Sequence, residues 1–251
     1  MTSNNDDSLD GRCALVTGAS RRIGATIVRR LHAAGARVGI HYRRTATEAC
    51  ALRDALNTGR PDSAAVFQAD IADVGETTRL AGDFLAWAGR IDCLVNNASA
   101  FYPTPLGSIS EADWDDLVGS NLKGPLFLTQ AMAGELQAAG GSVVNLVDIH
   151  ARRPLREHVV YGAAKAGLAM LTRSLAREMA PGVRVNGVAP GAIMWPEDGL
   201  DDKAKSAILR QVPLARAGDP GDIADCVLYL LRAPYVTGQI IAVDGGRSIG
   251  W

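Results

Sequence analysis

The sequence is poor in cysteine. Its 251 residues include four, Cys13, Cys50, Cys93 and Cys226, which lie far apart and form no CxxC pair. This spacing argues against a zinc site and against a disulfide framework. We therefore expect no metal site, and a reducing compartment is the default.

The chain also lacks an excess of one charge and lacks long apolar runs. It has 26 Lys and Arg residues against 27 Asp and Glu residues, for a formal net charge of −1, so nothing favours nucleic acid or an anionic membrane as a partner. No run of about 18 apolar residues is long enough to span a membrane. The polar, acidic N-terminus lacks the basic start and apolar stretch of a secretory signal. We expect a cytoplasmic protein with no nucleic-acid or membrane partner.

Short apolar runs alternate with longer segments of helical spacing, such as Leu168, Leu171, Leu175 and Met179. Parallel strands need long crossovers, which cover both faces of a sheet, so this alternation predicts a parallel sheet between two layers of helices. We expect an α/β fold, a single Rossmann-type doubly wound domain with a seven-stranded parallel sheet. The predicted strands are 13–17, 36–42, 64–69, 91–96, 142–147, 183–188 and 240–243.

Two segments depart from this rhythm. Residues 1–11 have the composition of a disordered tail, which leaves 12–251 as the folded domain. Residues 191–218 form a long interruption that includes Pro213. Because long insertions in compact domains are often lids or binding loops, we expect a substrate loop there.

A glycine-containing turn, residues 17–24, joins the first predicted strand to the first predicted helix. Gly18 permits a tight turn and Gly24 permits close packing of strand and helix, while the helix N-terminus offers N–H groups to a pyrophosphate. We also place Arg22 and Ile23 of this turn at the cofactor. The pattern departs from GxGxxG, so a purely structural turn remains an alternative.

The end of the second predicted strand indicates which dinucleotide binds. An NAD enzyme usually places an acidic residue there for the ribose hydroxyls, and this chain has none. Two guanidinium groups and a hydroxyl suit a 2′-phosphate instead. We predict NADP(H), with two solvated arginines starting a helix as the alternative. The residues concerned are His41, Tyr42, Arg43, Arg44 and Thr45.

The next two strands also end in polar or small residues. Asp70 and Ile71 follow the third strand, where Asp70 would hold the adenine or, alternatively, cap a helix. Asn97, Ala98 and Ser99 follow the fourth. Ligands of open parallel sheets bind at these carboxyl ends, so we place all five residues at the cofactor.

Tyr161 and Lys165 stand four residues apart in a predicted helix, so they share one face. A nearby ammonium group favours the phenolate, and we therefore expect Lys165 to lower the pKa of Tyr161. Asp148 stands 13 residues before Tyr161, at the end of the fifth strand, and Asn121 begins the helix predicted after residues 114–120.

With these motifs together, the sequence resembles the short-chain dehydrogenase/reductase family over residues 12–246. The resemblance implies that Tyr161 is the proton donor, that Lys165 binds the nicotinamide ribose and tunes Tyr161, and that Asn121 supports a proton-relay water. It also implies a nicotinamide-contacting turn at Pro190, Gly191 and Ile193, and a C-terminal signature at residues 243–246.

Two departures from the family pattern narrow the range of expected substrates. Most members carry Ser where this chain has Asp148 and Gly where it has Arg22, and both changes resemble the pteridine reductase branch of the family. An Asp can relay protons to ring nitrogens, and Arg22 can face both the pyrophosphate and a polar heterocycle. The alternative role for Asp148 is purely structural, as a carboxylate that caps a loop.

In that branch an aromatic at the position of Phe101 and the nicotinamide sandwich a pterin ring, and the residue at Ser99 hydrogen-bonds near the pterin and the cofactor phosphates. Phe101 as a plain core residue is the alternative. Leu155 and Trp195 are expected by position to be apolar walls of the substrate site.

The resulting expectation is an NADPH-dependent pteridine reductase that reduces C=N bonds of pterins or folates, with a water-assisted proton near Arg22 in the second step. The alternatives are a dihydromonapterin reductase, a carbonyl or 3-oxoacyl reductase of the same family, and a non-catalytic NADP-sensing regulator. The resemblance further implies a homotetramer in which Arg247 or Trp251 reaches a neighbour's site.

Overall fold

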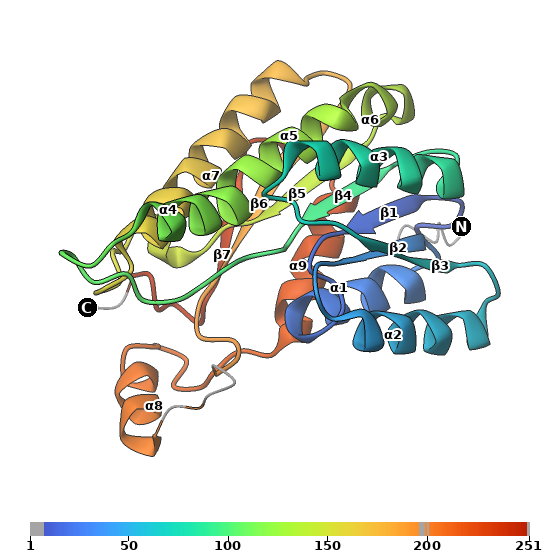
Figure 1. The fold of residues 1–251 in the computed structure, drawn as a ribbon. Coiled ribbons are helices and arrows are strands. Elements are labelled where there is room, and N and C mark those ends of the chain that lie inside the picture. The colour runs from blue at the N-terminus through green and yellow to red at the C-terminus, as the bar shows by residue number, and fades with distance from the viewer. Residues whose placement is uncertain (1–7, 196–198, 200, 250–251) are drawn as a thin grey trace.

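One parallel sheet organises the chain in a computed structural model, which describes residues 8–195, 199 and 201–249 (Figure 1). Its order is β3-β2-β1-β4-β5-β6-β7, and every neighbouring pair runs parallel. The seven-stranded doubly wound fold is confirmed. The strands are β1 (Cys13–Val16), β2 (Arg37–Tyr42), β3 (Ala64–Gln68), β4 (Cys93–Asn96), β5 (Ser142–Leu146), β6 (Arg184–Pro190) and β7 (Ile240–Val243).

Helices cover both faces of this sheet (Figure 1). On one face, α1 (Arg22–Ala33), α2 (Ala46–Gly59) and α9 (Pro220–Arg232) share a buried apolar cluster with the sheet. The other face carries α3 (Val74–Ala88), α5 (Gly124–Ala131), α6 (Ala133–Ala139) and α7 (Val159–Glu178), and α4 (Glu111–Val118) packs on α7.

The central strands β1, β4 and β5 are buried along their whole length, as expected for strands covered on both faces. Leu15, Val95 and Val144 are fully buried. Successive strands are added on one side of β1 up to β3 and on its other side from β4 onward, so the strand order reverses at β1, which lies between β2 and β4. In open α/β sheets the crevice at such a point, at the carboxyl ends of the strands, is where ligands bind.

The predicted strand ends differ from the observed ones by at most two residues. The predicted tail is wrong in part, because residues 8–11 belong to the folded domain. Leu9 is 2% exposed, and its N–H donates to the carbonyl of Ala34 at 2.6 Å. A single apolar side chain that fills a gap beside α1 outweighs the polar composition around it. Residues 1–7 lie outside the described part of the chain.

Two other local predictions change. The predicted loop at 191–218 contains a helix, α8 (Asp202–Leu209), which Figure 1 shows set apart from the sheet; residues 196–198 and 200 are outside the described part. Asn121 does not begin a helix. It lies in a π-helical turn, Gly119–Lys123, within a continuous helical stretch from α4 to α5.

Among the described residues, no helix combines the length and the apolar character that crossing a membrane requires.

Candidate active site

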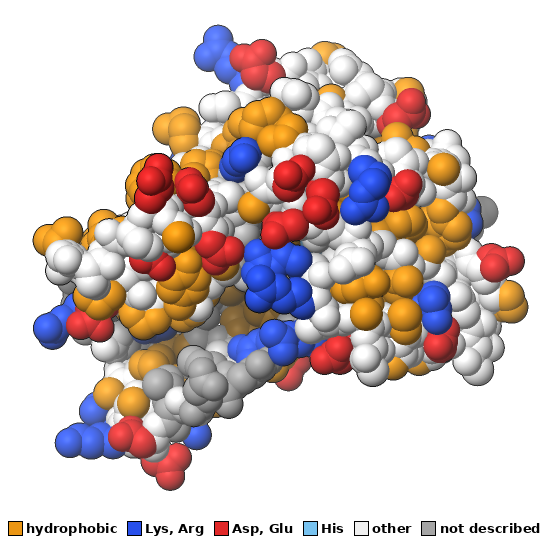
Figure 2. Space-filling model, in the orientation of Figure 1, with side chains coloured by type: hydrophobic (Ala, Val, Ile, Leu, Met, Phe, Trp, Pro, Cys, Tyr) orange, Lys and Arg blue, Asp and Glu red, His pale blue; other side chains and the backbone are white. Residues whose placement is uncertain are grey.

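The carboxyl ends of β1 to β4 enclose a cleft of about 500 Å³. In Figure 2 the hollow opens on the viewed face, with basic side chains at its edge. Fourteen of the predicted cofactor residues line it, although they come from four separate strand ends. They are Gly18, Arg22, Ile23, Gly24, His41, Tyr42, Arg43, Arg44, Thr45, Asp70, Ile71, Asn97, Ala98 and Ser99.

Neighbouring atoms leave no room for a side chain at either glycine of the turn after β1. Gly18 has a φ of +58°, and a Cβ there would lie 2.8 Å from the Cα of Ala98. A Cβ on Gly24 would lie 2.6 Å from the amide nitrogen of Asn97, which donates to the carbonyls of Thr17 and Gly18 at 2.8 and 2.9 Å. Side chains are therefore excluded from the floor of the cleft, and the N-terminus of α1 can approach an anion directly.

His41 shapes the cleft through both ring nitrogens. Its Nδ1 lies 3.1 Å from the backbone nitrogen of Gly18 and accepts that N–H, and its Nε2 lies 3.0 Å from the carbonyl oxygen of Ala69. Burial lowers the pKa of His41 to about 4. The neutral ring, protonated on Nε2, thus ties the ends of three neighbouring strands together.

The two arginines after β2 have different surroundings. Arg44 is exposed at the rim. Beside it, the hydroxyl oxygens of Ser20 and Thr45 lie 2.6 Å apart. Arg43 is held instead by two carboxylates: its Nη1 lies 3.5 Å from Oδ2 of Asp70 and 3.3 Å from Oδ1 of Asp116.

Asp70 does not cap a helix, which was its alternative role. Its Oδ1 accepts the N–H of Ala72, and the N-cap of α3 is Asp73. Asp116 was missed by the sequence analysis. It lies on α4, 46 residues beyond Asp70, and no motif marks it.

The predicted catalytic groups meet beside β5. The hydroxyl of Tyr161 donates to Oδ2 of Asp148 at 2.7 Å, and Oδ1 of Asp148 accepts the N–H of His150 at 2.8 Å. Lys165 is buried four residues further along α7. Its Nζ donates to the carbonyl of Leu146 at 2.8 Å and lies 5.7 Å from the centre of the Tyr161 ring.

The expected effect of Lys165 on Tyr161 is wrong in this structure. Burial, and then the charge of Asp148 and the hydrogen bond to it, raise the pKa of Tyr161 well above its usual value. Burial also lowers the pKa of Lys165 to about 8. The Lys165 ammonium group donates to the carbonyl of Leu146, and the phenol, hydrogen-bonded to Asp148, stays protonated at neutral pH.

Asn121 anchors the loop that follows β4. Its amide nitrogen donates to the carbonyls of Ala100 and Leu117, both at 2.9 Å, and its Oδ1 accepts the hydroxyl of Ser99 at 2.7 Å. The π-helical turn thus positions the segment that carries Ser99 and Phe101.

Phe101 is not a core residue, since half of its surface is exposed. Its ring stacks on His158 with centres 4.7 Å apart and planes 21° apart. The Phe101 ring also contacts the Tyr161 ring edge to face, with centres 4.8 Å apart and planes 78° apart. Phe101 therefore lies directly beside Tyr161, the predicted proton donor. Sequence analysis missed His158, which belongs to no motif.

Arg22 adopts a φ of +54°, the left-handed region that favours glycine. Its Nη2 donates to the carbonyl of Trp195 at 3.1 Å, which links the glycine turn to the 191–218 segment.

The remaining predicted residues lie outside the 500 Å³ cleft. Gly191 sits against β7, where its N–H donates to the carbonyl of Val243 at 3.0 Å, and Ile193 is buried. Pro190 ends β6, and Leu155 is half-buried in the loop before α7. Neither Leu155 nor Trp195 is among the residues that line the cleft.

Arg247 lies near Asp148 of its own chain, although the resemblance implied a neighbour's site. Burial lowers the pKa of its guanidinium, and Asp148 opposes this shift. Its carbonyl accepts from Nη1 of Arg153 at 2.7 Å. Trp251, the other residue in that prediction, is outside the described residues.

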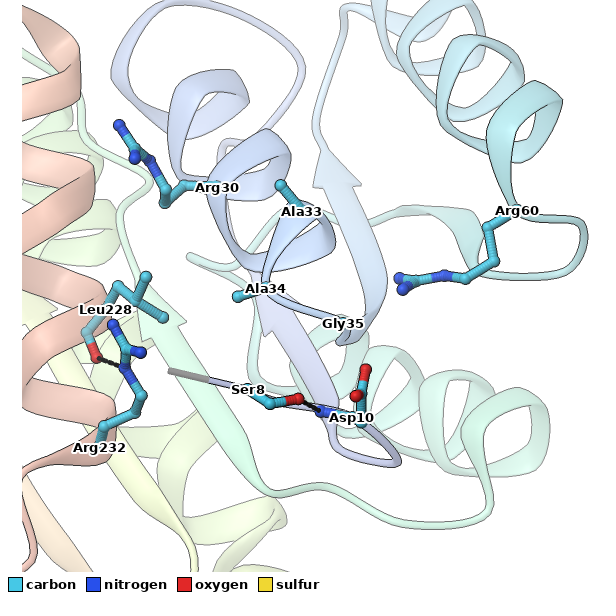
Figure 3. A pocket seen from close by; sticks show the side chains of 9 residues that line it. All are labelled: Ser8, Asp10, Arg30, Ala33, Ala34, Gly35, Arg60, Leu228 and Arg232. Carbon is cyan, nitrogen blue, oxygen red and sulfur yellow. Dashed lines mark hydrogen bonds between the residues drawn. The ribbon is translucent and has the colours of Figure 1, made fainter. Parts of the chain in front are cut away.

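A second pocket, of about 480 Å³, lies at the amino ends of the strands, on the opposite side from the cleft (Figure 3). Ser8, Asp10 and the end of α1 line it together with the end of α9. All three of its arginines have partners: Arg30 pairs with Asp225 at 3.0 Å, Arg60 donates to the carbonyl of Ala36, and Arg232 donates to the carbonyl of Leu228. It contains no predicted site residue and lies away from the strand ends where ligands bind.

Comparisons with known proteins agree with this architecture. A family model described as enoyl-(acyl carrier protein) reductase matches residues 18–248. A crystal structure of a Sinorhizobium meliloti 1021 protein, assigned to the short-chain alcohol dehydrogenases, superimposes with a TM-score of 0.91 at 36% identity, covering 97% of this chain and 99% of that one.

Two curated relatives are equally similar in sequence but differ in named activity. Pteridine reductase 1 of Leishmania tarentolae is 38% identical, over 94% of this chain and 96% of the relative. A 3-oxoacyl-[acyl-carrier-protein] reductase of Staphylococcus aureus is also 38% identical, over 94% and 97%. Overall identity does not separate the two activities, so residues of the site must.

Proposed function

The chain belongs to the short-chain dehydrogenase/reductase family of oxidoreductases, and on this premise we propose that it is an NADPH-dependent pteridine reductase that reduces C=N bonds of pterins or folates. One observation carries the proposal: the phenol of Tyr161 is hydrogen-bonded to a carboxylate, Asp148, at 2.7 Å. Most members are expected to have a serine hydroxyl there, which suits a ketone oxygen. A carboxylate exchanges protons and so suits a ring nitrogen.

The cleft fits NADP(H). Gly18 and Gly24 leave room for the pyrophosphate at the N-terminus of α1, because a Cβ at either position would meet backbone or Asn97. The exposed guanidinium of Arg44 and the hydroxyls of Ser20 and Thr45 are suited to a 2′-phosphate. The turn at Pro190, Gly191 and Ile193 is the proposed nicotinamide contact.

When bound, NADPH supplies the hydride that the ring carbon receives. Tyr161 supplies a proton to the adjacent ring nitrogen, and its raised pKa keeps the phenol protonated until then. The phenol donates to Oδ2 of Asp148, whose Oδ1 accepts the N–H of His150, so Asp148 orients the hydroxyl. Lys165 would hold the nicotinamide ribose, and Asn121 positions Ser99.

For the substrate, Phe101 offers an aromatic face next to Tyr161. A flat pterin ring stacks on such a face, and the gain is about 0.5–1.5 kcal/mol beyond burial. Ser99 and Arg22 offer polar contacts at the edge of the ring, and the second reduction takes a water-assisted proton near Arg22. Leu155 and Trp195 are the proposed apolar walls.

A 3-oxoacyl reductase is the second candidate, because the Staphylococcus relative is as similar as the pteridine reductase. A dihydromonapterin reductase would share the same catalytic pair. A purely NADP-sensing protein has no need of the Tyr161–Asp148 hydrogen bond.

We place the activity in the cytoplasm, since none of the four cysteines is paired. We also propose a homotetramer, which the family resemblance implies. Large exposed apolar side chains on three helices support an interface between copies: Trp114 on α4, Met170 on α7 and Tyr229 on α9.

The test is an NADPH oxidation assay with biopterin, dihydrobiopterin, dihydrofolate, an aryl ketone and a 3-oxoacyl thioester. The proposal expects the highest kcat/KM on a pterin or folate. A preference for the thioester or the ketone contradicts it and favours the second candidate.

A further inference from the structure

Arg43 and Thr45, which both follow β2, have partners that follow different neighbouring strands. β2 lies between β1 and β3 in the sheet. Arg43 contacts Asp70, which follows β3, and Asp116 of α4 on the helical layer opposite α1 and α2. Thr45, in contrast, contacts Ser20 of the turn after β1. One nitrogen of Arg43 therefore has both carboxylates as partners, on the side away from the hydroxyl pair.

The contact between Arg43 and Asp116 does little for the stability of the fold. The side chains of Arg43, Asp70 and Asp116 are 36%, 39% and 35% exposed, and ion pairs this open to water contribute little. Asp116 is nevertheless held in place. Burial and then its charge raise the pKa of the neighbouring Tyr102 phenol, so the carboxylate lies against a second polar group.

Two of these groups, Arg43 and Asp70, line the cofactor cleft, and Ser120 connects Asp116 to it. Ser120 also lines the cleft, and it donates to the backbone carbonyl of Asp116 at 2.7 Å. The guanidinium of Arg43 lines the cleft, and a guanidinium held there by two carboxylates can stack on an aromatic ring. Asp70 is well placed to accept from an exocyclic amine beside it.

We propose that Asp116 is a positioning residue for the cofactor: it holds Arg43 across the adenine end of the cleft, so that Arg43 binds the adenine ring and the 2′-phosphate is left to Arg44, Ser20 and Thr45. This inference rests on the proposed function, which places a dinucleotide in this cleft. The sequence analysis assigns both Arg43 and Arg44 to the 2′-phosphate, whereas this inference assigns Arg43 to the adenine ring and Arg44 to the phosphate.

The experiment measures Kd for NADPH and for NADH by isothermal titration in the full chain and four variants. Asp116→Asn keeps the size of the side chain and removes its charge. Asp115→Asn is the matched control, since Asp115 is exposed on the same helix. Arg43→Ala and the double variant complete a cycle, and thermal melting confirms that each variant is folded.

Asp116→Asn and Arg43→Ala are expected to raise Kd for both cofactors by the same factor, about 3- to 10-fold, because a lost cation–ring contact is of that size. The double variant should lose no more than Arg43→Ala, since the two residues act as a unit. At saturating NADPH, kcat should not change. Asp115→Asn should match the parent.

Two results overturn the inference. If Asp116→Asn tightens NADPH but not NADH, Asp116 competes with the 2′-phosphate for Arg43. If Asp116→Asn matches Asp115→Asn, Asp116 has no role in binding. Failure of the proposed function is separate: a parent that reduces no pterin, or that prefers NADH, contradicts that function while the equal loss for both cofactors still stands.

Discussion

The hydroxyl of Tyr161 and the carboxylate of Asp148 are joined by a 2.7 Å hydrogen bond, although 13 residues of sequence separate them. Asp148 lies two residues after the end of β5, and Tyr161 lies in the first turn of α7. Burial, and then the charge of Asp148 and the hydrogen bond to it, raise the pKa of Tyr161, so the phenol is protonated at neutral pH.

Removal of the phenolic hydroxyl tests the proton donor. Tyr161→Phe keeps the ring that meets Phe101 at 4.8 Å and removes only the acid. General-acid catalysis contributes about 10²- to 10⁴-fold, so kcat should fall by that order while Kd for NADPH stays within twofold. Steady-state kinetics and cofactor titration measure both. Near-normal turnover removes Tyr161 from the mechanism.

A reversed charge at the rim tests the 2′-phosphate site. Arg44→Asp removes a cationic ligand and adds repulsion, so NADPH should weaken by about 10- to 150-fold more than NADH. The control is Arg29→Asp, which makes the same change at an exposed position of α1 outside the cleft. An unchanged ratio of the two Kd values in Arg44→Asp places the phosphate elsewhere.

The positive φ of Arg22 predicts that replacing this residue by glycine stabilises the fold but weakens substrate binding. Arg22→Gly relieves the left-handed backbone, whereas Arg22→Ala removes the same guanidinium but keeps the strain. The Gly variant should exceed the Ala variant by about 1 kcal/mol in free energy of unfolding. Both should show a raised KM for the pterin. Equal stabilities in urea denaturation argue against strain at this residue.

His41 predicts loss of stability in acid. Its pKa is about 4 in the folded protein and about 6.5 in the unfolded chain. Between these values the unfolded state binds more protons, so the free energy of unfolding falls as pH falls, by about 2 kcal/mol from pH 7 to pH 5.

The measurement compares urea denaturation of the parent and of His41→Gln at both pH values. Gln keeps one donor and one acceptor for Ala69 and Gly18 but does not titrate. The variant should lose about 2 kcal/mol less than the parent over this range. The same acid slope in both proteins shows that another group is responsible.

Much of the cofactor cleft is predictable from the sequence because the carboxyl ends of parallel strands converge. Once the seven strands are placed, Gly18, Arg44, Asp70 and Asn97 must lie near one another. The same reasoning brings Asp148 to Tyr161, since the helix after β5 begins beside that strand's end.

What the sequence does not predict depends on long connections and on burial. Asp116 reaches Arg43 because α4 returns to the strand ends after the long connection of residues 97–110. The direction of the Tyr161 pKa shift depends on desolvation and on where the Lys165 ammonium points. Leu9 is buried because of the shape of the surface beside α1, which its own neighbours in sequence do not reveal.

The central claim is that Asp148 and Phe101 adapt a family reductase to a pterin ring. The most direct measurement is kcat/KM for dihydrobiopterin and for an aryl ketone in the parent, in Asp148→Ser and in Phe101→Ala. Asp148→Ser should lose pterin turnover by at least about tenfold, with ketone activity kept or improved. Phe101→Ala should mainly raise the pterin KM by about 2- to 12-fold. Equal losses on both substrates, or a parent that reduces only the ketone, contradict the account.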